Sequence, residues 1–292
     1  MRGDPEAHTL HAGNSLSEVL ARLASAPGEW TPLAGGTEVM VAHAAGRLTP
    51  GKFISVWGLP ELGGIAVSDG SISIGGGVTF GQLRRHELIA SEFPLLTRAA
   101  SWIGSIANQN RATLAGNIVN GSPAADAPPA LLVYDAEIEL VSSSGRRRMP
   151  YADFHIGYKR NQMRPDELVL ALHLPRRFTS HAQYLRKVGT RRAMAITKVA
   201  IAGAALVEDG VVREIRLGAA SLANRPVRLV NTERELLGRP LDSGSSSAAL
   251  TALRNEVLPI DDIRSTAAYR RQVAVNLLAE FLDELVVTRG VR

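Results

Sequence analysis

Cysteine does not occur anywhere in the 292 residues of the chain. Its absence excludes disulfides, thiolate-bound zinc and a catalytic thiol, and it excludes any iron–sulfur cluster ligated by thiolates of this chain. No stretch of about 20 consecutive apolar residues exists, so the sequence predicts no transmembrane helix. The first residues lack the apolar core of a signal peptide, and we therefore expect a cytoplasmic protein.

Aromatic residues are scarce as well, at 5% of the chain. The 33 Lys and Arg residues exceed the 28 Asp and Glu residues, which gives a net charge of +5, but the basic residues form short, scattered doublets. A nucleic-acid surface needs aromatic side chains interleaved with cations, so we expect no nucleic-acid binding. The seven histidines form no metal-binding motif, and no metal site is predicted.

The remaining composition, 45% hydrophobic and 21% charged residues, is typical of a globular protein, and the length suggests two domains. The patterning predicts an α+β chain with a mixed domain up to residue 177 and a sheet-plus-helix domain after it. Ser15–Glu18 is a capping box that begins an early helix. Further helices are expected at 93–107 and 266–287, and Ser243–Ser247 is expected to be a flexible connector.

Residues Leu33–Glu38, Leu-Ala-Gly-Gly-Thr-Glu, connect a predicted strand to a predicted helix through two glycines. Consecutive glycines let backbone N–H groups approach an anion closely, and a helix N-terminus adds a favourable dipole. The segment is therefore a candidate phosphate cradle. The alternative is a purely structural turn, because Gly-Gly turns between strand and helix are common.

A second segment of this kind lies about 80 residues later, at Thr113–Asn117, Thr-Leu-Ala-Gly-Asn. Two such loops could hold a pyrophosphate from both sides, and the carboxylate of Asp126 is suited to a ribose hydroxyl. Each feature has a structural alternative. Thr113 and Asn117 could satisfy the backbone of a turn, and Asp126 could cap a helix before Ala-Pro-Pro.

Taken together, these segments resemble the FAD-binding medium subunit of the molybdenum hydroxylases, the family of xanthine dehydrogenase and aerobic carbon monoxide dehydrogenase. Four stretches carry the resemblance, in the family's order and over nearly the whole chain. They are LAGGTEVMV at 33–41, ATLAGNIVNGSPAADAPPALL at 112–132, FHIGYKRNQMRPDELVLALHLP at 154–175 and RKVGTRRAMAITKVAIA at 186–202.

The resemblance implies an FAD-binding domain of the vanillyl-alcohol-oxidase (PCMH) type at 1–177, with subdomains at about 1–57 and 58–177. A carbon monoxide dehydrogenase flavoprotein-type C-terminal domain would follow at 178–292. The resemblance assigns FAD binding, with the pyrophosphate held by the two glycine loops, to Leu33, Ala34, Gly35, Gly36, Thr37, Glu38, Ile103, Thr113, Leu114, Ala115, Gly116, Asn117, Asp126, Val169 and Lys187.

Lys187 matches a lysine that lies near the isoalloxazine in relatives, so it is the candidate for tuning the flavin; otherwise it is a surface lysine at a strand end. The chain departs from the family pattern where Ala115 replaces a glycine and Glu38 replaces a common aspartate. Ala115 would be strained only if the loop required a positive φ there.

In the family, substrate is oxidised at a molybdenum cofactor, and electrons cross two [2Fe–2S] clusters to FAD. Without thiolates, this chain would need a large molybdenum-cofactor subunit and a small [2Fe–2S] subunit as partners, in a dimer of heterotrimers. FAD would pass the electrons to NAD⁺, a quinone or oxygen. The alternatives are a stand-alone FAD-dependent oxidoreductase and a non-enzymatic nucleotide-binding module.

Overall fold

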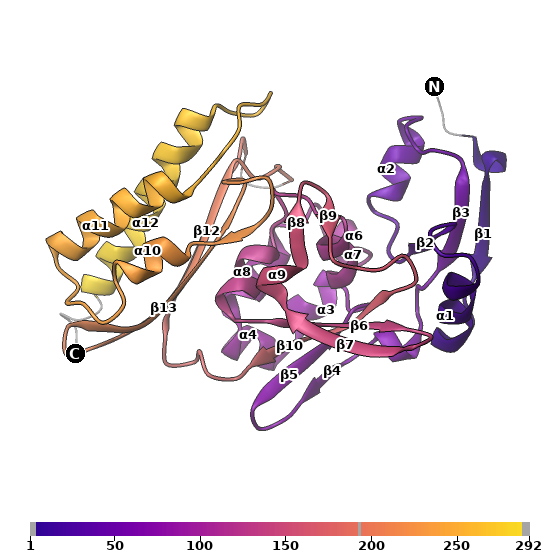
Figure 1. The fold of residues 1–292 in the computed structure, drawn as a ribbon, viewed down its shortest axis with the longest axis horizontal. Coiled ribbons are helices and arrows are strands. Elements are labelled where there is room, and N and C mark those ends of the chain that lie inside the picture. Colours follow the sequence, from indigo (N-terminus) through magenta and orange to yellow (C-terminus); the bar gives the residue numbers. More distant parts are fainter. Residues whose placement is uncertain (1–3, 192–193, 288–292) are drawn as a thin grey trace.

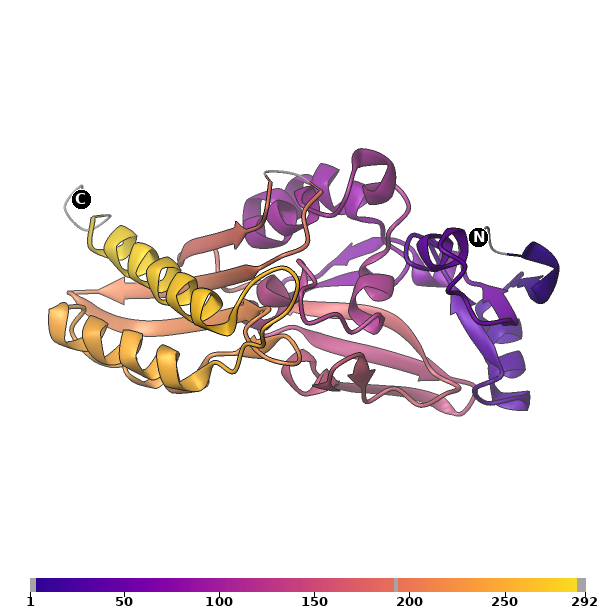
Figure 2. The same cartoon turned by 90° about the horizontal axis from the view of Figure 1, so that it is seen from above.

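The computed structural model describes residues 4–191 and 194–287, whose three larger sheets are arranged along the long axis of the molecule, with a fourth, two-stranded sheet beside the central one (Figure 1). Three hydrophobic cores lie along this axis, and they are shared between neighbouring sheets: the core beside the N-terminal sheet includes Val141, Leu168 and Leu170 of the central sheet, and the largest core includes Leu185, Ala202 and Ala204 of the C-terminal sheet. Figure 2 shows the same order from above, with the N-terminal sheet at one end and the C-terminal helices at the other. In the described part of the chain, no helix is both long and apolar enough to cross a membrane.

The N-terminal sheet has three parallel strands in the order β1-β3-β2. Ser15 caps α1, because its hydroxyl accepts a hydrogen bond from the Glu18 amide, whereas the Glu18 carboxylate accepts from the Asn14 amide and so does not complete the predicted capping box. The apolar face of α1 is buried against the sheet. The elements of this part are the 3-10 helix Pro5–Ala7, β1 (His8–Ala12), α1 (Leu16–Ser25), β2 (Trp30–Leu33), α2 (Val39–Ala44) and β3 (Gly51–Ser55).

The central sheet is antiparallel, in the order β4-β5-β10-β6-β7, and short helices pack on it around the largest core. Its strands are β4 (Ile65–Val67), β5 (Ser71–Gly75), β6 (Glu137–Ser142), β7 (Gly145–Pro150) and β10 (Leu168–Pro175). The 3-10 helix Pro60–Leu62 precedes β4, and the helices are α3 (Phe80–Arg85), α4 (Glu87–Glu92), α5 (Pro94–Ser101), α6 (Ile106–Gln109), α7 (Leu114–Val119), α8 (Pro128–Val133) and α9 (Tyr151–Phe154). The hairpin of β8 (His155–Gly157) and β9 (Arg160–Asn161) lies beside them.

The C-terminal sheet is antiparallel, in the order β11-β12-β13-β14. Helices α10–α12 lie on its outer side, and α8 contacts β12 and β13 (Figure 1). The elements are β11 (Ala182–Val188), β12 (Val199–Glu208), β13 (Val211–Ala220), β14 (Val227–Arg228), α10 (Val230–Arg234), α11 (Ser243–Glu256) and α12 (Ala267–Val287).

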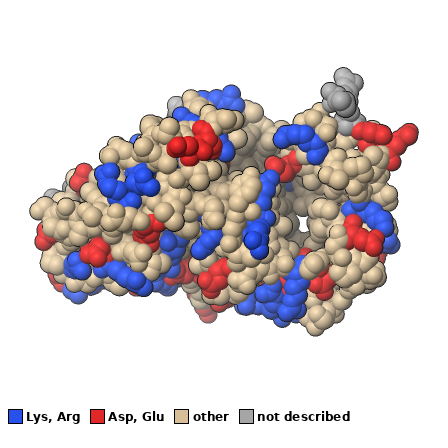
Figure 3. Space-filling model, turned by 45° about the horizontal axis from the view of Figure 1, so that its top comes forward, with Lys and Arg blue, Asp and Glu red and all other residues tan. Residues whose placement is uncertain are grey.

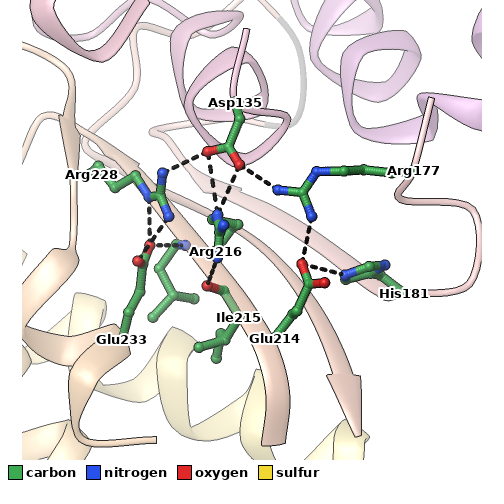
Figure 4. Close-up of polar contacts among 9 residues, drawn as sticks. Asp135, Arg177, His181, Glu214, Ile215, Arg216, Arg228 and Glu233 are labelled. Carbon is green, nitrogen blue, oxygen red and sulfur yellow. Dashed lines mark hydrogen bonds and ion pairs between the residues drawn. The ribbon is translucent and has the colours of Figure 1, made fainter. Parts of the chain in front are cut away.

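A charged cluster joins the C-terminal sheet to the central part at the end of α8 (Figure 4). The Asp135 carboxylate accepts hydrogen bonds from Arg177, Arg216 and Arg228 at 2.6–2.9 Å, and Arg228 also pairs with Glu233. Asp135 has a φ of 48°, a left-handed conformation that Asp tolerates better than most residues. This Asp135 cluster connects α8 to β13 and β14.

Two sequence predictions differ from the structure. Ser243–Ser247 is not a flexible connector but the first turn of α11, because Asp242 accepts a hydrogen bond from the Ser245 amide in a capping box. The helix expected at 93–107 ends at Ser101, and Ile103 lies in the loop before α6. The expected final helix agrees closely with α12.

Candidate functional site

A cavity of about 470 Å³ lies between the N-terminal sheet and the central part of the molecule. Figure 3 shows the surface hollowed between these two parts. Its size is in the range of small-molecule and cofactor sites. Of the predicted site residues, those that line the cavity are Leu33, Ala34, Gly35, Gly36, Thr37, Glu38, Ile103, Thr113, Ala115, Gly116, Asn117 and Val169.

The first glycine loop offers free backbone donors to this cavity. Within the described residues, the amides of Gly35, Gly36, Thr37 and Glu38 have no hydrogen-bond acceptor in the protein. Gly36 has a φ of 74°, which turns the chain between β2 and α2 and favours glycine. A run of unpaired amides in a turn is an anion-binding arrangement. Because α2 has only six residues and its bounding residue Glu38 makes no side-chain cap, the loop rather than a helix dipole provides the donors.

The first glycine loop contacts Arg111 and Ala112, the residues that lead directly into the second loop, although about 80 residues separate the two loops in sequence. The Arg111 Nε donates to the Gly35 carbonyl oxygen at 3.4 Å, and the Arg111 guanidinium lies 3.8 Å from the centroid of the Trp57 ring. A Cβ at Gly35 would overlap the carbonyl group of Arg111. The close approach of the loops therefore depends on the absence of a side chain at Gly35.

The second loop, unlike the first, has no unpaired backbone amides from Leu114 to Asn117. Its amides are already used: Leu114 N donates to the Val78 carbonyl, Ala115 N to the Gly76 carbonyl and Gly116 N to the Thr113 hydroxyl. Asn117 N donates to the carbonyl of Thr113. The loop contributes side chains instead, because it is folded as the first turn of α7 against the segment after β5.

Asn117 is the clearest polar group on this side of the cavity. Its side-chain Oδ1 is buried and has no hydrogen-bond partner among the described residues. An unpaired buried amide oxygen is costly and is typical of a ligand contact. Thr113, by contrast, has the structural role suggested as its alternative. Its hydroxyl accepts a hydrogen bond from the Gly116 amide and so caps α7. Its hydroxyl hydrogen remains available to a ligand.

Ala115 and Leu114 have simple structural explanations. Ala115 lies in the first turn of α7 and has no positive φ, so alanine in place of the family's glycine causes no backbone strain. Leu114 is fully buried in the central core and does not line the cavity. At neighbouring Gly76, a Cβ would overlap the Val169 carbonyl oxygen, so this wall also requires a glycine.

Sequence reasoning missed part of the cavity wall between β9 and β10. The wall includes Met163, Arg164 and Pro165, which belong to an irregular loop inside the stretch 154–175 that carries the family resemblance, but which were not assigned to the site. Arg147 on β7 holds this loop: it pairs with Glu167 at 2.7 and 2.8 Å and donates to the Gln162 carbonyl oxygen. This pairing and the Arg164 amide lower the pKa of Glu167 below its usual value, against the effect of burial.

Asp126 and Lys187 lie together but outside the cavity lining. The Lys187 ammonium is 2.9 Å from the Asp126 carboxylate, and the Thr197 hydroxyl donates to the other carboxylate oxygen at 2.6 Å. Asp126 does not cap α8, so the alternative role suggested for it, that of a helix cap, is not observed. Burial raises the pKa of Asp126, while Lys187 and Thr197 oppose that change. Lys187 is thus a buried, paired lysine rather than a surface one.

No group of three or more His, Asp or Glu side chains within 4–191 and 194–287 could hold a metal ion. The cavity is lined by backbone amides, threonine hydroxyls, carboxamides and the charged residues Glu38, Arg164 and Glu167. The unpaired amides of the first loop suit an anionic ligand such as a phosphate.

Two family models match the chain: the FAD binding domain in molybdopterin dehydrogenase at residues 6–177, and the CO dehydrogenase flavoprotein C-terminal domain at 184–285. The putative xanthine dehydrogenase FAD-binding subunit XdhB of Escherichia coli is 30% identical, covering 97% of each chain. The nicotinate dehydrogenase FAD-subunit of Eubacterium barkeri is 29% identical over 87% of this chain and 88% of the relative. A chain of carbon monoxide dehydrogenase from Hydrogenophaga pseudoflava has the same fold, with a TM-score of 0.88, 24% identity and 95% coverage of both chains.

Proposed function

The chain belongs to the family of FAD-binding subunits of molybdopterin dehydrogenases, and from this membership we propose that it binds FAD in the cavity between its two glycine loops. One observation supports the proposal most strongly: both loops line one cavity, and the first of them presents four unpaired amides. The chain would act as the flavoprotein subunit of a molybdenum hydroxylase. It is an oxidoreductase subunit that receives electrons from a partner.

The residues present fit FAD. The amides of Gly35–Glu38 would bind the pyrophosphate, with the Asn117 Nδ2 and the Thr113 hydroxyl as donors on the opposite side, and the unpaired Asn117 Oδ1 would accept a hydrogen bond from a donor group of the cofactor. Ile103 and Val169 provide apolar surface for the ring systems. We further propose a domain of the vanillyl-alcohol-oxidase type with subdomains at about 1–57 and 58–177, and a C-terminal domain at 178–292.

When bound, FAD can accept electrons one at a time and release them in pairs. Because the chain has no cysteine, the [2Fe–2S] clusters that supply those electrons would belong to a small partner subunit. A large subunit would hold the molybdenum cofactor, and the complex would be a cytoplasmic dimer of heterotrimers. The acceptor would be NAD⁺, a quinone or oxygen. This chain's own residues bind and orient the flavin and set the charge around it.

A visible spectrum of the purified protein tests FAD binding, and metal analysis tests the subunit role. We expect flavin absorption bands from the chain alone, with iron and molybdenum present only when its partner subunits are copurified. A colourless protein that binds ADP-like ligands would instead indicate a nucleotide-binding module. Turnover of an organic donor by the isolated yellow chain would indicate a stand-alone flavoenzyme.

Lys187 and Asp126 provide a second test, because the proposal places their charges near the flavin. Replacing Lys187 with Met removes a cation that favours the reduced, electron-rich flavin, so it should lower the reduction potential. The variant Asp126→Asn leaves an unpaired cation and should raise it. We expect shifts of a few tens of millivolts, where about 30 mV corresponds to about 1.4 kcal/mol for a two-electron couple.

Spectroelectrochemical titration of the three FAD-loaded proteins gives these potentials, and Lys52→Met is a control. Lys52 is an exposed lysine of the N-terminal sheet that pairs with Glu29. Opposite shifts in Lys187→Met and Asp126→Asn support an electrostatic role. Unchanged potentials, or shifts of the same sign in both variants, contradict it.

A further inference from the structure

Thr197, which lies just before β12, is fully buried and binds the carboxylate of Asp126. Its hydroxyl donates to Oδ1 of Asp126 at 2.6 Å, and the Lys187 ammonium donates to Oδ2 at 2.9 Å. The side chains of Asp126 and Lys187 are only 11% and 9% exposed. Two donors therefore converge on one carboxylate that little water can reach.

Burial and these two donors act on the Asp126 carboxylate in opposite directions. Removal from water favours the neutral form and raises the pKa of Asp126, whereas Lys187 and Thr197 favour the ionised form. Hydrogen bonds to an ionised group are about twice as strong as those between neutral groups. Among the described residues, the charged group that faces Asp126 is Lys187 of β11. The charge of Asp126 thus depends on one ammonium and one hydroxyl.

The backbone around Thr197 is fixed by Ser221, which directly follows β13. The Ser221 hydroxyl donates to the Thr197 carbonyl at 2.9 Å, and the Ser221 amide donates at 2.8 Å to the carbonyl of Pro123, three residues before Asp126. Ser221 therefore holds both segments that meet in the hydrogen bond. It does so with a φ of 62°, a left-handed conformation that costs serine free energy and that occurs mostly at functional sites.

We propose that Thr197 is a positioning residue: its hydroxyl holds the Asp126 carboxylate ionised against Lys187 and so sets the charge that this pair presents to the flavin. The inference rests on the proposed function, which places the pair near the flavin. With both groups ionised the pair carries no net charge, whereas a protonated Asp126 leaves the Lys187 cation uncompensated. A nearby cation favours the reduced flavin, so the charge of Asp126 affects the reduction potential.

The variant Thr197→Val keeps the branched shape of the side chain but removes the hydroxyl. The Asp126 carboxylate should then bind a proton about tenfold more tightly, because one hydrogen bond to its charged form is lost. An infrared pH titration of the flavin-free chain measures this affinity through the carboxyl band that Asp126→Asn lacks. The variant Thr197→Ser retains the hydroxyl and should titrate like the parent protein.

The flavin potential of the FAD-loaded chain, measured by spectroelectrochemical titration at several pH values, gives the second readout. In Thr197→Val, Asp126 takes up its proton at a higher pH, so the potential should rise above that of the parent as the pH falls. At alkaline pH, where Asp126 is ionised in both proteins, the two potentials should agree. The largest difference should be about half of the alkaline shift in Asp126→Asn, because a tenfold change in proton affinity changes the protonated fraction by about one half at most.

Thr232→Val is the matched control for Thr197→Val. Thr232 is equally buried, and its hydroxyl donates to the Glu256 carboxylate at 2.7 Å, but it belongs to α10 on the outer side of the C-terminal sheet (Figure 1). Its variant should keep the parent's flavin potential at every pH.

The proposal is overturned if Thr197→Val leaves the proton affinity of Asp126 unchanged. It is also overturned if the potential of Thr197→Val follows that of the parent at every pH, or if both threonine variants shift the potential alike. Because the infrared titration needs no flavin, failure of FAD binding is distinguishable from failure of this proposal.

Discussion

Replacing Gly35 with alanine will leave the purified protein almost without flavin. A Cβ at this position would overlap the carbonyl group of Arg111, so the first glycine loop would have to move away from the second. The four unpaired amides from Gly35 to Glu38 would then no longer face Asn117. We expect a loss in FAD affinity of at least about 100-fold, or about 2.7 kcal/mol, measured by fluorescence titration of flavin-free protein.

Gly70→Ala is the matched control for this variant. Gly70 also lies in a turn, has no positive φ, and has no atom within 4 Å of the position that a Cβ would occupy. Its alanine variant should keep full flavin content, and both variants should show the parent's far-ultraviolet circular dichroism. Parent-like FAD affinity in Gly35→Ala would show that contact between the loops is not needed to hold the cofactor.

The substitution Asp135→Asn should destabilise the protein by about 3 kcal/mol, the usual scale for removing one partner of a largely buried ion pair. Asp135 faces three guanidinium groups, and its carboxylate is only 26% exposed (Figure 4). Asparagine tolerates the left-handed φ of this residue, so the change removes the charge and adds little backbone strain. Urea unfolding followed by circular dichroism measures the free energy.

Glu208→Ala is the comparison for Asp135→Asn. Glu208 pairs with Arg213 at 3.8 Å, and both side chains are about half exposed, so its removal should cost less than about 0.5 kcal/mol. Hydrogen exchange should show weaker protection of β13 and β14 in Asp135→Asn. A free energy of unfolding equal to that of Glu208→Ala would mean that the Asp135 cluster does not secure the C-terminal sheet.

Local signals were sufficient for several parts of the fold. The Ser15 capping box and the apolar face after it predicted α1, and the spacing of apolar residues predicted α12. The Leu33–Glu38 segment was recognisable because glycine turns have few chemical substitutes. The prediction for Ser243–Ser247 was wrong. Serine-rich composition indicates a flexible segment, but Asp242 caps the segment and begins α11.

Pairings between distant residues could not be read from the sequence. In the second loop, the amides of Leu114 and Ala115 donate hydrogen bonds to the carbonyls of Val78 and Gly76, almost 40 residues earlier. Arg147 fixes the cavity wall through Glu167, and Asp126 meets Lys187 across 61 residues. No local pattern encodes such contacts, because they depend on how the sheets pack. Resemblance to the family identified Asp126 and Lys187 as site residues, but not as partners of each other.

The two glycine loops have a consequence for how the protein matures in the cell. The first loop follows the N-terminal sheet and the second begins α7 in the central part, and the core between these parts includes Val141, Leu168 and Leu170 of the central sheet. A ligand gripped by both would act as a non-covalent cross-link, and its binding free energy would favour the joined arrangement. A shortage of FAD would then have a second effect besides loss of activity. Newly synthesised chains without the cofactor would open more readily between these two parts and would be degraded sooner.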